Sequence, residues 1–219
     1  DVNAANPFVW PSSTTSYQVT LTDVNNCEAT DSLLVEVNPE LTVDAGADQT
    51  ICFGDDAFLN ASVTGGAPQF NYSWVPINGL SNPGASSLVA NPTITTTYHL
   101  TITDSLGCIA NDSLTITVNP QLTVDAVNDT LICFGDTAQL NAVGSGGTLP
   151  YTFAWSPNLD IGDTATANPM VWPSANTIWE VTLQDSLGCI ATDSVTVEVN
   201  PEIIADAGPD TSICFGESI

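Results

Sequence analysis

Six cysteines are the side chains best suited to covalent chemistry in this sequence, and their spacing is regular. They form two series, each with a period of 81 residues: Cys27, Cys108 and Cys189, and Cys52, Cys133 and Cys214. An even number of cysteines at repeated positions predicts a disulfide framework. Structural disulfides persist in oxidising compartments outside the cytosol, so these cysteines predict a secreted protein.

Other residues recur with the same period, which indicates a tandem array. Trp74 returns as Trp155, and the run Ile51-Cys52-Phe53-Gly54 returns twice. We predict four parts: the C-terminal half of one repeat at residues 1–39, complete repeats at 40–119 and 120–200, and the N-terminal strands of a further repeat at 201–219.

The elements that position these residues are predicted to be short strands. In the segments 98–103 and 114–118, large apolar residues alternate with polar ones, as in a half-buried strand. The two segments flank Ser105-Leu106-Gly107, a hairpin pattern, and Gly- and Pro-rich turns separate further strands upstream. About seven short strands in roughly 80 residues, with a Trp on the third, predict an immunoglobulin-like sandwich. The fold class is therefore all-β, with tandem immunoglobulin-like domains in a linear array.

Several of these motifs resemble a known family. Val43–Thr50, Gly54-Asp55, Tyr72-Ser73-Trp74 and the strand Thr97–Asp104 resemble PKD-like repeats. The added Ile-Cys-x-Gly and Leu-Gly-Cys motifs resemble those of giant Bacteroidota surface proteins, which are exported by the type IX system and act in adhesion or gliding. The resemblance implies an extracellular or cell-surface location and a spacer or stalk role. The total lack of basic residues departs from the family and suggests a specialised polymer.

The charge of the chain is one-sided: 25 Asp and Glu, one His, and no Lys or Arg. Nucleic-acid binding is excluded, because neutralising phosphates needs a basic surface. No apolar run approaches the roughly 20 residues of a membrane span, so no membrane insertion is expected in this segment. Trypsin-like proteases cleave after Lys or Arg and therefore have no cleavage site in this sequence. Lys-dependent isopeptide crosslinks are impossible, which leaves disulfides as the covalent option.

The predicted topology discriminates between cysteine pairings. In an immunoglobulin-like sandwich, Cys52 lies in an early turn and Cys108 begins the last strand, at opposite ends of the domain. A strand of seven residues spans roughly 23 Å, whereas bridged Cα atoms lie within about 7 Å. We therefore favour a Cys52–Cys189 bond between repeats, with the remaining cysteines paired to preceding or following repeats. The alternative is Cys52–Cys108 and Cys133–Cys189 within repeats.

The dipeptide Asp-Ser or Asp-Thr followed by a small or apolar residue is frequent and resembles the O-glycosylation signal of Bacteroidota. Such residues are also common in the turns and outward faces of acidic β-proteins. Ser32, Ser113 and Ser194 have the outward parity of the last strand, so we expect them to be accessible to a sugar. Asn111-Asp112-Ser113 also matches the short N-linked pattern, to which we give little weight. The candidate glycosylation residues are Ser32, Ser105, Ser113, Thr130, Thr137, Thr164, Ser186 and Ser194.

No catalytic residue, metal site or cofactor is predicted. His99, the only histidine, has an outward parity, and Gln18 and Glu180 take its place in the other repeats. The recurring aspartate pairs, such as Asp44 and Asp48, offer fewer oxygen ligands than the six or more that Ca²⁺ takes, and turn capping suits them better. A repeat array also places equivalent residues in every unit, which suits a scaffold and not a single cleft. The chain is therefore not expected to be an enzyme.

Two functions from different classes remain. The first is a structural segment of a long extracellular bacterial filament or surface stalk, stiffened by disulfides and O-glycosylated, whose partners are neighbouring copies or repeats. The second is an adhesin whose loops, such as Gly65–Pro68 and Ser145–Thr148, bind glycans or host surfaces. Because these two loops differ in sequence, the structural role is favoured.

Overall fold

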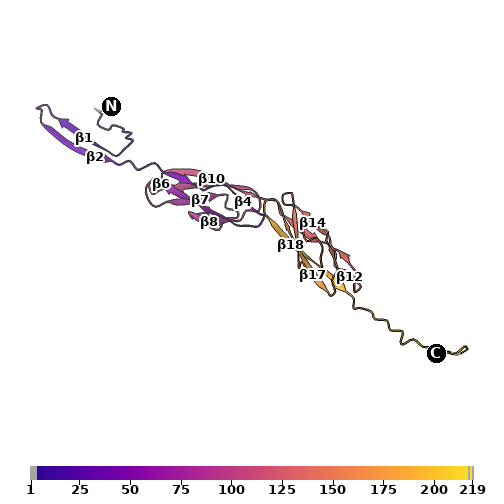
Figure 1. Ribbon diagram of the computed structural model, residues 1–219. Coiled ribbons are helices and arrows are strands. Elements are labelled where there is room, and N and C mark those ends of the chain that lie inside the picture. Colours follow the sequence, from indigo (N-terminus) through magenta and orange to yellow (C-terminus); the bar gives the residue numbers. More distant parts are fainter. Residues whose placement is uncertain (1–3, 217, 219) are drawn as a thin grey trace. The chain divides into compact units, whose positions relative to one another are not determined.

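The computed structural model describes residues 4–216 and residue 218, and all regular elements in this part of the chain are β-strands. The chain divides into two compact units, one ending at Asn119 and the other beginning at Pro120. Each unit contains a β-sandwich (Figure 1). No helix long and apolar enough to cross a membrane occurs among the described residues. The domain ranges expected from the repeat stay a prediction.

The first sandwich pairs one four-stranded sheet with two shorter strand pairs. Its large sheet has the order β4-β10-β9-β7, in which β4 runs parallel to β10 and the other neighbours are antiparallel. The opposite layer consists of the pairs β3–β6 and β5–β8. The strands are β3 Thr42–Asp44, β4 Gln49–Ile51, β5 Ala57–Asn60, β6 Ser62–Thr64, β7 Asn71–Val75, β8 Ser87–Ala90, β9 Thr96–Thr103 and β10 Ile109–Val118.

The second sandwich has the same strand order. Its large sheet is β12-β18-β17-β15, again with a parallel first pair, and the pairs β11–β14 and β13–β16 form the opposite layer. Its strands are β11 Thr123–Ala126, β12 Thr130–Ile132, β13 Ala138–Gln139, β14 Ala142–Ser145, β15 Thr152–Ser156, β16 Met170–Val171, β17 Thr177–Gln184 and β18 Ile190–Val199.

Alternation along the strands builds each core. In the first unit, Tyr98 and Leu100 of β9 and Leu114 of β10 point inward and are at most 2% exposed, as is Trp74 of β7. The second unit buries the matching set, including Trp155, Val181 and Val195. The recurring Trp74 and Trp155 are thus core residues of their units. Each indole Nε1–H donates to a backbone carbonyl, of Ala85 in the first unit and of Thr166 in the second.

One buried aromatic position differs between the units. Tyr98 donates its hydroxyl to the carbonyl of Asn78 at 2.8 Å. Trp179, which replaces it in the second unit, is fully buried, and its indole Nε1–H has no hydrogen-bond partner. The second unit therefore gains ring volume at this position but leaves one buried donor unsatisfied.

The partial repeats at the two ends of the sequence differ in secondary structure: the first forms two strands, and the described part of the last forms none. Strands β1 (Thr15–Thr22) and β2 (Glu28–Val35) form an antiparallel hairpin with the register of β9–β10, since Tyr17 pairs with Leu33 as Tyr98 pairs with Leu114. The N-terminal strands expected in 201–219 are absent from the described part, residues 201–216 and 218. The corresponding strands β3 and β4 are held by pairing with β6 and β10, and the described part of 201–219 makes no such strand pairing. Residues 217 and 219 lie outside the described residues.

Candidate functional site: cysteine turns, carboxylate clamps and hydroxyl positions

Each cysteine of the Cys27 series follows a hairpin turn that an aspartate caps. In the turn between β9 and β10, Asp104 Oδ1 accepts the backbone N–H groups of Leu106 (2.9 Å) and Cys108 (2.8 Å). Asp185 makes the same two bonds to Leu187 and Cys189, both at 2.9 Å. Asp23 accepts the N–H of Cys27 at 2.8 Å. The aspartate four residues ahead therefore fixes the backbone of the cysteine, an interaction that prediction from the sequence missed.

The second oxygen of the same carboxylate holds a distant loop. Asp104 Oδ2 accepts the N–H of Ala67 at 2.9 Å, and Asp185 Oδ2 accepts the N–H of Thr148 at 2.9 Å. A Cβ on Gly66 would stand 3.2 Å from Asp104 Oδ2 and 2.8 Å from a methyl carbon of Leu41, so only glycine fits over the carboxylate. The loops proposed as binding loops are thus pinned to the hairpins of their own units.

Burial and hydrogen bonding both act on these carboxylates. Asp104 and Asp185 are only 3% and 5% exposed. The N–H of Ala67 is the main cause that lowers the pKa of Asp104 below its ordinary value, against the opposing effect of burial. Burial raises the pKa of Asp185, but the N–H groups of Thr148, Cys189, Leu187 and Gly188 together outweigh it, so the net pKa is lowered. Both side chains are therefore ionised acceptors at neutral pH.

The carboxylate also affects the neighbouring thiol. Desolvation of the Cys108 thiol, and then the negative charge of Asp104, raise the pKa of Cys108 above its ordinary value. The thiolate is the form that attacks disulfides and alkylating agents, so Cys108 is held in its less reactive form.

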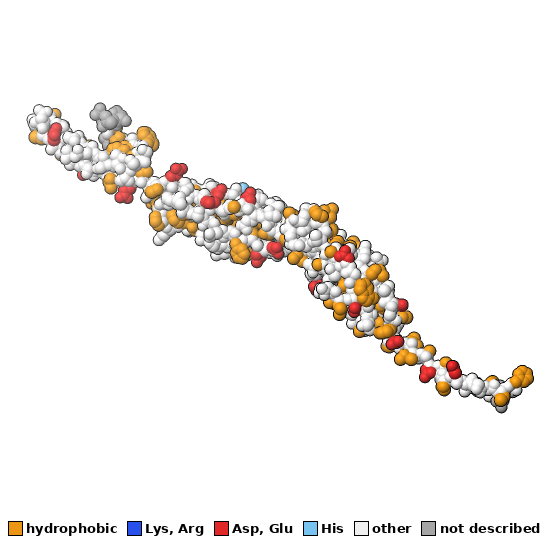
Figure 2. All heavy atoms as spheres, in the orientation of Figure 1, with side chains coloured by type: hydrophobic (Ala, Val, Ile, Leu, Met, Phe, Trp, Pro, Cys, Tyr) orange, Lys and Arg blue, Asp and Glu red, His pale blue; other side chains and the backbone are white. Residues whose placement is uncertain are grey.

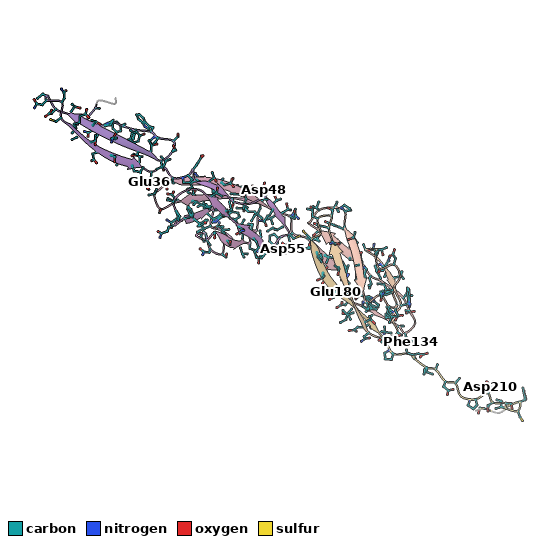
Figure 3. The ribbon with its side chains drawn as sticks, turned by 60° about the vertical axis from the view of Figure 1, so that its left-hand side comes forward. Glu36, Asp48, Asp55, Phe134, Glu180 and Asp210 are labelled. Atoms are coloured by element: carbon teal, nitrogen blue, oxygen red, sulfur yellow. The ribbon has the colours of Figure 1, made fainter. Side chains whose placement is uncertain are left out.

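The cysteines of the other series lie in a turn at the end of a short strand. Cys52 directly follows β4, and its carbonyl accepts the N–H of Asp55 at 3.1 Å; Gly54 has a positive φ of 90°. The Asn91 side-chain amide donates to the carbonyls of Gly54 (3.0 Å) and Asp55 (2.9 Å) and fixes this turn. Asp55 is labelled in Figure 3 on the first sandwich, as is Asp48, which precedes β4.

The strand register separates the two cysteines of a repeat. Ile51, beside Cys52, pairs with Val118 at the end of β10, whereas Cys108 precedes Ile109 at its beginning. The 10 residues of β10 span roughly 33 Å at about 3.3 Å per residue. This distance far exceeds the 7 Å or so between bridged Cα atoms, so it excludes the Cys52–Cys108 alternative. Cys133 and Cys189 stand in the same relationship across β18, which excludes their pairing too.

The oxidation states agree with this geometry. Cys52 and Cys189 are each disulfide-bonded. Cys27, Cys108 and Cys133 are exposed free thiols. Cys108 and Cys133, the intra-repeat partners that the alternative requires, are thus unoxidised.

Two further carboxylates join the first strands of each sandwich to the last. Asp112 Oδ2 on β10 accepts the N–H of Ala45 at 2.7 Å, and Asp48 Oδ1 accepts the N–H of Thr115 on β10 at 2.7 Å. The second unit repeats both bonds, from Ala126 to Asp193 at 2.7 Å and from Thr196 to Asp129 at 2.8 Å. We call this pair of bonds the reciprocal clamp.

The hydroxyl groups of the candidate glycosylation residues are accessible in most cases. Ser32, Ser105, Ser113, Thr137, Ser186 and Ser194 are exposed, and Thr130 and Thr164 are half-buried. Ser186 Oγ donates to the carbonyl of Thr148 at 3.1 Å, so this hydroxyl is already engaged. The outward parity predicted for Ser113 and Ser194 is confirmed, since the adjacent Leu114 and Val195 are buried. Ser32 is exposed, but the adjacent Leu33 is also 65% exposed, because β1 and β2 form a two-stranded hairpin, so the parity predicted for Ser32 is not confirmed.

The residues weighed for other chemistry are not brought together. Asp44 Oδ1 accepts the N–H of Gly46 at 2.8 Å, which is the turn-capping role. No group of three or more His, Cys, Asp or Glu arranged to hold a metal occurs among the described residues. His99 is exposed on β9, opposite Ser113 of β10. Carboxylates are scattered over the visible surface, with uncharged areas between them (Figure 2).

Comparison with known proteins gives a likeness of fold. No family model matches the chain, and no curated protein matches it. The eight N-terminal Ig domains of Down Syndrome Cell Adhesion Molecule match with a TM-score of 0.54 at 16% identity, over 85% of this chain and 27% of that one. This chain thus spans about a quarter of that structure.

Two further solved structures have lower scores. Three immunoglobulin domains of titin match with a TM-score of 0.46 at 10% identity, over 87% of this chain and 75% of that one. A C-terminal fragment of intimin, solved with the intimin-binding domain of its translocated receptor, has a TM-score of 0.46 at 17% identity, over 75% and 64%. The strand topology and the first of these likenesses establish the fold class: all-β, with tandem immunoglobulin-like domains.

Proposed function

We propose that this chain is a segment of a long extracellular bacterial filament or surface stalk, in which disulfide bonds join one repeat to another. The observation that carries the proposal is the placement of Cys52 and Cys108 at opposite ends of β10. Because a repeat with this geometry has no bond available between its own two cysteines, its cysteines serve other repeats. Crosslinks of that kind stiffen a string of domains, which a filament or stalk requires.

The specific bond we propose is Cys52–Cys189, with Cys27, Cys108, Cys133 and Cys214 paired in the same pattern to other repeats. The disulfide-bonded state of Cys52 and Cys189 supports this pattern. The partners are thus neighbouring copies or repeats of the same kind.

Composition supports a location outside the cell. A chain without Lys or Arg resists trypsin-like proteases and forms no Lys-based crosslink. The resemblance to PKD-like repeats of Bacteroidota surface proteins suggests type IX export, which we include in the proposal. We also propose O-linked glycans on the exposed Asp-Ser and Asp-Thr hydroxyls, among them Ser113 and Ser194, which are exposed at equivalent strand positions of the two units.

A scaffold role explains the loops better than adhesion does. Ala67 and Thr148 are tied through their N–H groups to buried carboxylates. A loop fixed in this way supports the hairpin beside it.

Peptide mapping under non-reducing conditions tests the crosslink. The secreted protein is digested with Asp-N protease, because trypsin has no cleavage site, and linked peptides are identified by mass spectrometry. We expect a Cys52–Cys189 peptide that disappears on reduction. A Cys52–Cys108 peptide would overturn the proposal, and so would free thiols at both Cys52 and Cys189 in material trapped at low pH. Negative-stain microscopy then distinguishes fibres, the expected result, from dispersed particles.

A further inference from the structure

The outer face of the sheet β4-β10-β9-β7 carries no carboxylate, although the chain has 25. Its outward positions hold Thr, Ser and Asn with Val, Ile and the single His, and they form rows across the strands. Thr97 and Thr115 Oγ1 atoms share a hydrogen bond at 2.9 Å, and Thr101 Oγ1 donates to Asn111 Oδ1 at 2.7 Å. The face is thus neutral and rich in groups that hydrogen-bond to uncharged polar ligands.

This face is hollowed around Ser113. An open hollow of about 470 Å³ is lined by His99, Leu100, Asn111, Asp112 and Ser113. The hollow is wide open to solvent, so a ligand in it would be held from one side only. Asp112 has the inward parity, and its Oδ2 is engaged by Ala45, so the imidazole, amide and hydroxyl are the polar side chains that face outward.

The second unit supplies a natural control. Ser194 has the same strand position as Ser113, but its cross-strand neighbour is Glu180, and Thr192 stands where the first unit has Asn111. Glu180 is exposed on β17 and is labelled in Figure 3. The two serines therefore share backbone geometry and a preceding aspartate but differ in the charge and hydrogen-bonding capacity of their surroundings.

We propose that Ser113 is a glycosylation site whose neutral glycan lies in this hollow, held by His99 and Asn111, whereas a glycan on Ser194 extends freely into solvent. The inference rests on the O-glycosylation in the proposed function. In the attachment step, Ser113 Oγ attacks the anomeric carbon of a sugar diphosphate donor. The bond from that carbon to the diphosphate breaks with its electron pair, and the hydroxyl proton passes to a base of the transferase.

Mild periodate oxidation of the secreted, folded glycoprotein tests the proposal, because periodate cleaves accessible vicinal diols of sugars. Glycopeptides that carry Ser113 and Ser194 are followed over time by mass spectrometry. We expect the Ser113 glycan to oxidise about fivefold more slowly, the protection that one or two net hydrogen bonds give. The His99→Glu variant, which copies the second unit, should raise the Ser113 rate to that of Ser194. Denatured protein should show equal rates at both sites.

The outcomes separate the two levels of the proposal. If neither serine carries a sugar, O-glycosylation of the strands fails, and this inference fails with it. If both carry sugars that oxidise at equal rates in the folded protein, glycosylation stands and the held glycan is overturned. A bare Ser113 beside an occupied Ser194, or a sugar on Asn111 in its place, also overturns the inference.

Discussion

Asp112 and Ala45 are separated by 67 positions in sequence, yet the Asp112 carboxylate accepts the Ala45 N–H at 2.7 Å. Together with the bond from Thr115 N–H to Asp48, it closes the reciprocal clamp around the short parallel pair β4–β10, whose register covers only three residues on each strand. Two charge-assisted bonds thus reinforce a contact with few ladder bonds, because bonds to ionised acceptors are the stronger kind.

Removing this clamp should release the first strands before the rest of the sandwich. We expect Asp112→Ala to lower the free energy of unfolding by about 1.5–3 kcal/mol, the usual effect of a lost hydrogen bond to a charged group. Amide exchange should accelerate most at Ala45. Hydrogen exchange and urea denaturation measure both effects.

Asp55→Ala is the matched control for that variant, because Asp55 is an exposed aspartate in a turn after β4. A change below about 0.5 kcal/mol is expected there. Equal effects of the two substitutions would show that the clamp adds nothing beyond surface charge.

Tyr98 offers a second test, since its buried hydroxyl donates to the Asn78 carbonyl and burial raises its pKa. Tyr98→Phe should lower the free energy of unfolding by about 0.5–1.5 kcal/mol at neutral pH. A raised folded pKa means that this contribution is complete below the ordinary tyrosine pKa of about 10 and is lost as pH rises above it.

The difference in stability between the wild type and Tyr98→Phe should therefore shrink in alkaline solution, as measured by urea denaturation from about pH 8 to pH 11. Tyr17→Phe serves as the control, because Tyr17 lies in the β1–β2 hairpin and is only half-buried. A difference that stays constant across this range would contradict the role assigned to the hydroxyl.

The buried carboxylates Asp104 and Asp185 make acid stability a further test. Their folded pKa values are lowered, so their contribution is present above the ordinary aspartate pKa of about 3.9 and is lost as pH falls through the folded values. Protonation of the other carboxylates works in the opposite direction, because it relieves self-repulsion in a chain with a charge of −25.

Comparison with a variant that lacks both carboxylates separates the contribution of Asp104 and Asp185 from the relief of charge repulsion. The double variant Asp104→Asn, Asp185→Asn should melt at a lower temperature than the wild type at pH 6, and the two melting curves should converge towards pH 2. Calorimetry at several pH values measures this, with Asp55→Asn as the exposed control. A gap that persists unchanged at pH 2 would mean that the charge on these residues is not what stabilises the hairpin.

The sequence predicts the fold well where alternation is strong. Period-two patterns in β9 and β10 predict the inward Leu100 and Leu114 and the outward His99 and Ser113, all as found. The strands predicted within 201–219 do not form in the described residues of that segment, because a short strand depends on its partner and not on its own pattern. The contact between Asp104 and Ala67 is equally non-local, since it joins residues 37 positions apart through the path of a loop.

The clamps were nevertheless partly visible in the sequence. Asp112 and Asp193 have the same parity as the core residues Leu114 and Val195, and an inward aspartate needs a hydrogen-bond donor. The spacing from Asp104 to Cys108 also recurs in every repeat. These aspartates also belong to the Asp-Ser motifs expected to carry sugars or to form turns, and the motif alone does not predict their distant hydrogen-bond donors.

Cys108 provides the last prediction, because desolvation, and then the negative charge of the Asp104 carboxylate that fixes its backbone, raise the pKa of its thiol. At pH 8 the thiolate fraction, and with it the rate of alkylation by iodoacetamide, should be lower than for an unstructured cysteine. Asp104→Asn removes the negative charge while keeping the shape of the side chain, so it should accelerate alkylation of Cys108 several-fold and leave Cys133 unchanged. Site-resolved mass spectrometry under native conditions gives both rates in one sample. If Cys133 accelerates equally, the substitution has loosened the whole chain; if neither changes, the carboxylate does not control the thiol. A slow thiol at this turn would keep the hairpin cysteine reduced until its disulfide partner arrives, and would protect the finished bond from exchange with stray thiols.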